Sequence, residues 1–183
     1  MEPVEITAGR LHLRPFAPAD EDDVYAACQD AEIQRWTRVP SPYTREHARQ
    51  FLIDDTPRNW RDDTAYTFAV CDSVSGDVLA TVSLHRKRTD NVAEIGYWCA
   101  AWARGRGVTT EAVGAVCRWG FAGLGIARIE WHAAVGNPAS RRVAEKAGFS
   151  IEGRLRSRLE LSGVRHDAWV GGLLPDDVSP PPR

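Results

Sequence analysis

The chain has 183 residues, of which 43% are hydrophobic and 26% charged, a composition typical of one globular domain with its own core. Its 23 basic and 25 acidic side chains give a net charge of −2, which excludes the strongly basic field of a protein that binds nucleic acid or anionic membranes. The sequence has no apolar stretch of membrane-spanning length, no apolar signal core at its N-terminus and no Cys-x-x-Cys pair among its four cysteines. We therefore expect a cytoplasmic protein without a metal site.

In chain order, the first half of the sequence predicts a strand over 11–14, helices over 18–30 and 45–56, and strands over 66–70 and 78–84. Thr44 is a suitable N-cap for the second helix, and Pro57 is expected to end it. Ser75-Gly76 marks the turn between the two later strands. Residues 1–10 are expected to be an N-terminal extension outside the domain.

The second half predicts a strand over 92–99, a helix over 108–124, a strand over 129–133, a helix over 138–147, and closing strands over 151–157 and 165–173. Gly148 follows the second of these helices at the position where glycine often ends a helix. Together these elements indicate one mixed α/β domain over residues 11–174, built around a largely antiparallel sheet. The proline-rich tail over 175–183 is expected to be disordered.

A glycine-rich turn that joins a predicted strand to a predicted helix is the most informative segment. Its backbone amides gather at a helix N-terminus, which together with the helix dipole binds anions such as phosphate. Gly105 and Gly107 allow the backbone to approach an anion closely, and Arg104 and Arg106 add positive charge. The dinucleotide fingerprint G-x-G-x-x-G fails at Thr110, and the sequence contains no Walker motif. A flexible loop is the alternative interpretation.

Two motifs in the sequence resemble those of a known family. Arg104-x-x-Gly107-x-Thr109 resembles the R/Q-x-x-G-x-G/A pyrophosphate loop of the GNAT N-acetyltransferase superfamily, although Thr109 stands where glycine or alanine is usual. Residues 137–149 resemble the N-x-x-S-x-x-V-x-E-K-x-G-F helix of the RimJ/RimL branch, which acetylates ribosomal proteins. The resemblance covers about residues 11–174.

The resemblance implies a GNAT α/β fold, with a twisted mixed sheet and flanking helices. It implies direct transfer of an acetyl group from acetyl-CoA, the co-substrate, to a primary amine. The strands over 92–99 and 129–133 would splay apart and admit pantetheine, and the amides of the glycine turn would hold the pyrophosphate. The coenzyme-binding residues that it implies are Trp98, Cys99, Ala100, Arg104, Gly105, Arg106, Gly107, Val108, Thr109, Asn137 and Arg142.

Acyl transfer to an amine needs a neutral amine, a polarised thioester carbonyl and a proton for the departing thiolate. Many GNAT enzymes take that proton from a tyrosine seven positions after the motif asparagine, where this sequence has Ala144. The resemblance implies Ser140 as the acid instead, with helix capping as its alternative role. Glu94 stands where some members carry a catalytic base, with a solvated strand carboxylate as the alternative, and His85 is a second candidate base. Cys99 is expected to be an inert buried thiol.

The acceptor site is expected to include Trp36 and Tyr43, because they lie in the N-terminal helical region that closes over the acceptor in this family. His85 is a further candidate for this site. A packing role in the core is the alternative for Trp36. His132 shares a strand face with Glu130, and we expect this pair to face solvent.

We therefore expect an acyl-CoA-dependent N-acetyltransferase whose acceptor is a protein N-terminus or a small-molecule amine. Another short acyl donor, such as succinyl-CoA, is an open alternative. A non-catalytic acyl-CoA-binding sensor or scaffold is a second, because the usual tyrosine is missing at Ala144. No nucleic-acid or membrane partner is expected, and a homodimer stays open.

Overall fold

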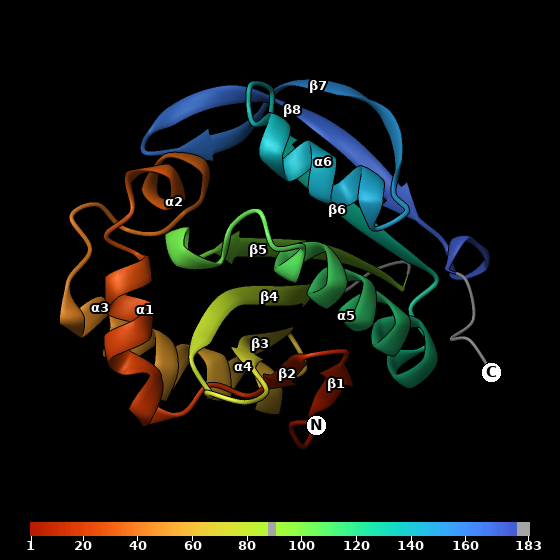
Figure 1. Ribbon diagram of the computed structural model, residues 1–183. Helices are drawn as coiled ribbons and strands as arrows, with labels where there is room; N and C mark the ends of the chain where they lie inside the picture. The colour runs from red at the N-terminus through yellow and green to blue at the C-terminus, as the bar shows by residue number, and fades with distance from the viewer. Residues whose placement is uncertain (88–90, 179–183) are drawn as a thin grey trace.

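Eight strands form one twisted sheet in the part of the chain that the computed structural model describes, residues 1–87 and 91–178 (Figure 1). The strand order is β1-β2-β3-β4-β5-β6-β8-β7, and all neighbours are antiparallel except β5 and β6, which are parallel. The mixed, mostly antiparallel sheet predicted from the sequence is confirmed. The strands are β1 (Ile6–Ala8), β2 (Leu11–Arg14), β3 (Ala65–Asp72), β4 (Val78–Arg86), β5 (Val92–Cys99), β6 (Arg128–Ala134), β7 (Ser150–Leu161) and β8 (Val164–Leu173).

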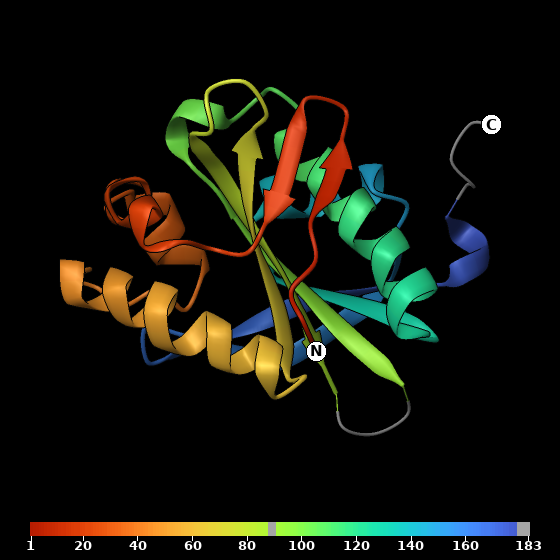
Figure 2. The same ribbon diagram turned by 90° about the horizontal axis from the view of Figure 1, so that it is seen from below.

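The helices lie in two groups on opposite sides of this sheet. The later pair covers one face, with α5 packed against β4 and β5 and α6 against β6 (Figure 1). The N-terminal helices gather on the other side, where α4 packs against β3 (Figure 2). None of the helices in the described ranges is long and apolar enough to cross a membrane. The helices are α1 (Glu21–Ala27), α2 (Ala31–Trp36), α3 (Arg45–Arg49), α4 (Thr56–Arg61), α5 (Val108–Leu124) and α6 (Pro138–Lys146).

The helix expected over 18–30 ends early, and a second helix follows it. The first helix begins with a 3₁₀ turn, and its α-helical part ends at Ala27. The Asp30 carboxylate then accepts hydrogen bonds from the backbone amides of Glu32 and Ile33, both at 3.0 Å. This capping begins α2, to which the sequence pattern assigned no separate element.

Pro57 does not end the second predicted helix, contrary to the sequence-based expectation. Thr44 caps its start as predicted, but the helix widens into a π-helical segment over Gln50–Asp55 and continues as α4. In that segment the Thr56 amide donates five residues back, to Phe51. Pro57 therefore lies in the first turn of a new helical stretch, where a missing amide donor costs no hydrogen bond.

The two ends of the chain also differ from the expected boundaries. Residues 6–8, within the expected extension over 1–10, form β1 and pair with β2 at the edge of the sheet. Residues 175–177 of the expected tail form a 3₁₀ turn, and residues 179–183 lie outside the described residues. Ser162 and Gly163 form the turn of the β7–β8 hairpin, as the sequence predicts.

The core lies between the sheet and α5. The face of α5 that carries Val113, Val116 and Gly120 is buried. Gly120 lets α5 approach β4, because a Cβ there would stand 2.8 Å from a methyl group of Leu84. The Trp60 indole donates to the Thr67 carbonyl on the part of β3 that β2 does not reach, so the bare edge of β3 is also covered.

Candidate active site

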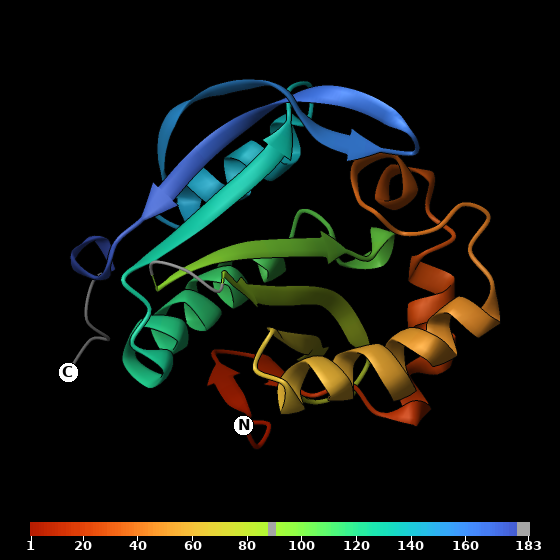
Figure 3. The ribbon, with the colours of Figure 1, turned by 180° about the vertical axis from the view of Figure 1, so that it is seen from behind.

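A cleft of about 1260 Å³ lies where the sheet splits between β5 and β6. The parallel pairing of these strands covers only Val92–Ile95 and Arg128–Trp131, after which β5 stays with β4 and β6 with β8. The two strands diverge like the arms of a V, which opens toward α2 (Figure 3). Side chains from α2, β4, β5, α5 and α6 line the cleft, so both halves of the chain contribute to its walls.

β5 presents backbone groups without a strand partner to this cleft. Hydrogen bonds of an antiparallel strand alternate between its two edges. Since the Ala100 amide donates to Leu79, the backbone groups of Trp98 point toward β4, and those of Tyr97 and Cys99 point toward the gap. The Ala100 carbonyl accepts within the 3₁₀ turn that follows. Trp98, Cys99 and Ala100 are among the residues expected to bind the coenzyme. Of these three, Cys99 has its backbone available, whereas Trp98 and Ala100 use theirs within the protein.

The turn between β5 and α5 brings a helix N-terminus to the cleft wall. Gly105 and Gly107 have positive φ values, +75° and +78°, which glycine adopts without side-chain strain. Apart from chain neighbours, no described atom lies within 4 Å of the place where a Cβ would stand on either glycine. The first amides of α5, including those of Val108 and Thr109, have no partner within the helix. The turn therefore offers open backbone donors to an anion.

The two arginines of this turn differ in their contacts. Arg104 holds the Asp30 carboxylate in a forked ion pair, with nitrogen–oxygen distances of 2.6 and 3.3 Å. This contact raises the pKa of Arg104 and lowers that of Asp30. Arg106 is exposed outside the cleft wall, and its carbonyl accepts from Arg10. The groups of this turn that are free to meet an anion therefore include its backbone amides, at the positive end of the helix dipole.

Asn137 and Ser140 lie at the start of α6, on the other arm of the V, and both line the cleft. The side-chain carbonyl of Asn137 accepts from the Ser140 amide at 3.1 Å, so Asn137 is the N-cap of this helix. The Ser140 side chain contributes nothing to the cap. Helix capping, the alternative role for Ser140, is therefore wrong.

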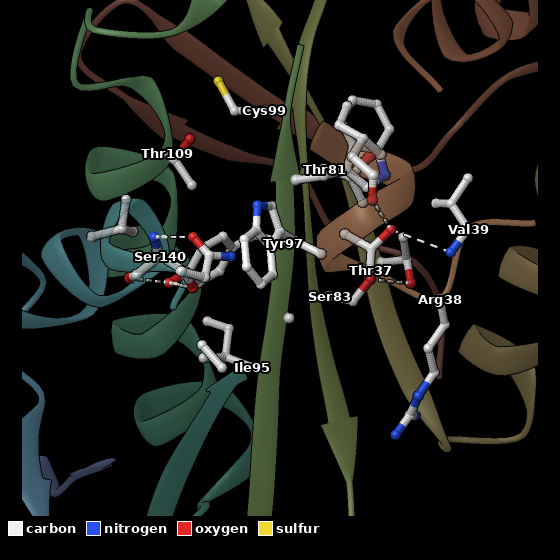
Figure 4. A pocket seen from close by; sticks show the side chains of 18 of the residues that line it. Thr37, Arg38, Val39, Thr81, Ser83, Ile95, Tyr97, Cys99, Thr109 and Ser140 are labelled. Atoms are coloured by element: carbon white, nitrogen blue, oxygen red, sulfur yellow. Dashed lines mark hydrogen bonds between the residues drawn. The ribbon is translucent and has the colours of Figure 1, made fainter. Parts of the chain in front are cut away.

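The Ser140 hydroxyl instead contacts one side chain from each arm of the V. Its oxygen lies 3.1 Å from the indole nitrogen of Trp131 on β6, which donates to it, and 3.1 Å from the Tyr97 hydroxyl on β5 (Figure 4). The Tyr97 hydroxyl also lies 2.9 Å from the Ser140 carbonyl. Burial raises the pKa of Tyr97 above its usual value, so this hydroxyl stays a neutral donor. Neither Tyr97 nor Trp131 was among the predicted site residues; strand alternation could have placed them on one face, but not beside Ser140.

Glu94 lies on the opposite face of β5, among charged side chains. Its carboxylate is 3.2 Å from a ring nitrogen of His132 and 3.9 Å from the Lys87 ammonium, and His85 is its cross-strand partner on β4. Burial alone would raise the pKa of Glu94, but these three neighbours outweigh it and lower the pKa. Partial loss of hydration inside the cleft lowers the pKa of His85. The negative charge of Glu94 opposes this effect, and the positive charge of Arg38 lowers the pKa further. At neutral pH an ionised carboxylate therefore stands beside a neutral imidazole.

His132 does not face solvent, contrary to the sequence-based expectation. Its side chain is 4% exposed, and its Nδ1 atom has no hydrogen-bond partner among the described residues, because its approach to Glu94 lacks the required direction. Glu130 instead pairs with Lys87 and Arg128. The predicted His132–Glu130 pair is thus replaced by a contact between His132 and the carboxylate that faces the cleft.

Trp36 and Tyr43, expected in the acceptor site, and Arg142, expected to bind the coenzyme, differ in how far they are buried. The Trp36 indole donates to Glu32 at 2.8 Å, and the Arg35 guanidinium stacks 4.5 Å from its ring, so Trp36 is held at the mouth of the cleft. Tyr43 is 7% exposed and belongs to the apolar cluster beneath the N-terminal helices, so it offers the cleft little surface. Arg142 is exposed on α6 at the cleft wall.

Comparison with known proteins agrees with this geometry. The model of the acetyltransferase (GNAT) domain matches residues 10–150. The chain is 33% identical over 135 residues to the Bacillus subtilis protein named "Putative ribosomal N-acetyltransferase YdaF", covering 73% of each chain. A GNAT-family acetyltransferase from Bacillus anthracis superposes with a TM-score of 0.84 at 22% identity, covering 94% of this chain and 99% of that one. RimL, a ribosomal L7/L12 α-N-protein acetyltransferase in complex with coenzyme A, also gives 0.84 at 20% identity, covering 96% and 99%.

The split sheet, with a glycine turn at one arm and a hydroxyl-bearing helix at the other, is the fold of an acetyltransferase. The chain belongs to the GNAT acetyltransferase family and is an N-acetyltransferase.

Proposed function

We propose that this enzyme transfers an acetyl group from acetyl-CoA directly to an α-amine within a ternary complex. The single observation that carries the proposal is the V between β5 and β6, where open backbone groups of one arm face the Ser140 hydroxyl of the other. The acceptor we favour is a protein N-terminus in the cytoplasm, since relatives are named as ribosomal acetyltransferases. A small-molecule amine is the second candidate.

The residues along the cleft fit the parts of coenzyme A in order. The amides at Gly107, Val108 and Thr109 suit the pyrophosphate, because the space beside the turn is open and the helix dipole favours an anion. The backbone of Cys99 suits the amides of pantetheine. Arg142 suits the phosphate on the ribose, as an exposed cation on the wall. Acetyl-CoA supplies the activated thioester, and every other chemical role falls to the protein.

Ser140 acts as the donor to the departing sulfur, because its hydroxyl is held at the closed end of the V and does not cap the helix. Cys99 is not a nucleophile in this proposal. Burial raises the pKa of its thiol, which therefore stays protonated at neutral pH. Transfer without an acyl-enzyme follows from this lack of an activated thiol.

Glu94 acts as the base through water, with His85 beside it. Because the pKa of Glu94 is lowered, it is a weak base and cannot easily deprotonate an amine of high pKa. The Lys87 ammonium beside it also disfavours a bound ammonium. An α-amine, with a pKa of about 8, is therefore a better acceptor than a lysine side chain, with a pKa of about 10.4.

Release of free thiol from acetyl-CoA across a panel of amines tests the proposal. The panel compares a peptide with a free N-terminus, the same peptide with a blocked N-terminus and an internal lysine, and small amines. We expect turnover with the free N-terminus and little with the lysine peptide. Turnover only with succinyl-CoA would change the donor. Binding of acetyl-CoA without thiol release from any amine would favour a sensor and overturn the catalytic proposal.

A further inference from the structure

We infer that Tyr97 and Trp131 are positioning residues, which hold the Ser140 hydroxyl and direct its proton toward the thioester sulfur. The inference rests on the proposed role of Ser140 as donor. The three side chains come from β5, β6 and α6 and meet where the V closes. The Ser140 oxygen lies 3.1 Å from the Tyr97 hydroxyl and 3.1 Å from the Trp131 indole nitrogen. The contact between Tyr97 and Ser140 joins the two arms of the cleft at this point.

Trp131 fixes one side of the hydroxyl. An indole N–H can only donate, so it occupies a lone pair of the Ser140 oxygen and cannot accept the serine proton. Trp131 itself is 1% exposed, and the core therefore holds its ring in place. With this lone pair engaged, the Ser140 proton has two possible acceptors nearby, the Tyr97 oxygen and a ligand in the cleft.

Tyr97 can make either of two hydrogen bonds with its single proton. When it donates to the Ser140 carbonyl, at 2.9 Å, its oxygen is free to accept the Ser140 proton at 3.1 Å. When it donates to the Ser140 oxygen instead, the serine proton is released toward the cleft. The oxygen then accepts two hydrogen bonds, which strengthens it as a donor.

The second arrangement matches the charge that develops during transfer. As the acceptor nitrogen bonds to the carbonyl carbon, the carbon–sulfur bond breaks and its electron pair stays on sulfur. Ser140 passes its proton to the sulfur as it takes one from water, so that no free alkoxide forms. Trp131 and Tyr97 stabilise the partial negative charge that the serine oxygen carries during this transfer. The proton that the acceptor amine loses to the base balances this one.

The same contact explains how the site manages without a tyrosine on α6. Ala144 stands where many GNAT enzymes carry that tyrosine. Its side chain is fully buried, one helical turn after Ser140. The Tyr97 hydroxyl reaches the first turn of α6 from β5. A tyrosine hydroxyl is therefore present beside the helix, although it comes from a different element.

A double-mutant cycle tests the inference. Tyr97→Phe keeps the ring and removes the hydroxyl, and we expect kcat to fall about tenfold while KM for acetyl-CoA is unchanged, as for loss of one hydrogen bond made in the transition state. In a Ser140→Ala background the same change should cost nothing further, because Tyr97 acts through Ser140. Tyr66→Phe, which removes a tyrosine hydroxyl outside the cleft, is the matched control.

A spectroscopic readout is independent of turnover. In ¹⁵N-labelled protein without ligand, the indole N–H signal of Trp131, assigned with Trp131→Phe, should shift and exchange faster with solvent in Ser140→Ala. If Ser140→Ala keeps full turnover, the acid assignment in the proposed function fails. If Ser140→Ala loses turnover but Tyr97→Phe does not, or if the two losses multiply, the acid assignment stands and this inference is overturned. An unchanged indole signal overturns it as well.

Discussion

The charged side chains around Glu94 lead to a pH prediction at the scale of single residues. Because the pKa of Glu94 is lowered, this carboxylate is ionised throughout the neutral and alkaline range. The rise of kcat/KM with pH should therefore follow the acceptor amine, near pH 8 for an α-amine, and not Glu94. Glu94→Gln should lower kcat/KM by about 10²–10⁴ and leave the position of that rise unchanged.

Glu130→Gln is the control for this pH profile. It removes a carboxylate from the same charged group, bonded to Lys87 and outside the cleft wall. We expect it to change kcat/KM far less than Glu94→Gln. If His85→Gln abolishes the rise and Glu94→Gln does not lower activity, His85 is the base and the role given to Glu94 is wrong.

The sequence predicts a site residue when the residue belongs to a motif. It does not predict a contact with a residue that is distant in the chain. Ser140 and Asn137 were found from their motif. The pairing of Arg104 with Asp30 joins residues that are 74 positions apart, so spacing could not reveal that this cation is already occupied. Likewise, alternation along β5 could not place Tyr97 beside Ser140, because the contact depends on how far the strands diverge.

At the scale of elements, the turn before α5 gives the sharpest prediction. Gly107→Val should weaken acetyl-CoA binding at least tenfold, or about 1.4 kcal/mol, because a branched side chain would stand in the open space beside the helix amides. Isothermal titration calorimetry on the folded variant measures this. Gly76→Val controls for backbone strain, since Gly76 also has a positive φ with open space around it but lies in the β3–β4 turn, away from the cleft. Equal affinity in the two variants would exclude the phosphate-loop role.

The long helices and strands were predictable because many residues in each follow the same hydrophobic periodicity. The predicted bounds of β5 and α5 coincide with the observed Val92–Cys99 and Val108–Leu124. The short N-terminal helices were not, since single local effects decide them. The Asp30 cap begins α2, and the wide turn over 50–55 carries a helix past Pro57. β1 has only three residues and exists through its pairing with β2.

At the scale of the whole molecule, ligand binding should raise the free energy of unfolding. A cleft whose walls come from both halves of the chain exists only in the folded protein, so acetyl-CoA should stabilise it by about 2.7 kcal/mol at one hundred times its dissociation constant. Thermal unfolding with and without the ligand measures the shift, with ATP and NAD as controls. The melting temperature of Gly107→Val should rise less than that of the unmodified protein at the same ligand concentration. A melting temperature that responds to ATP or NAD and not to acetyl-CoA would contradict the assigned cleft.

The split between β5 and β6 also bears on aggregation. Exposed strand edges normally invite pairing with other chains, and proteins blunt them with charges, prolines or bulges. Here an edge with available backbone groups at Tyr97 and Cys99 lies inside the molecule, between two diverging strands and beneath α5 and α6. The enzyme can therefore keep peptide donors and acceptors ready for a ligand without exposing an adhesive edge to its neighbours.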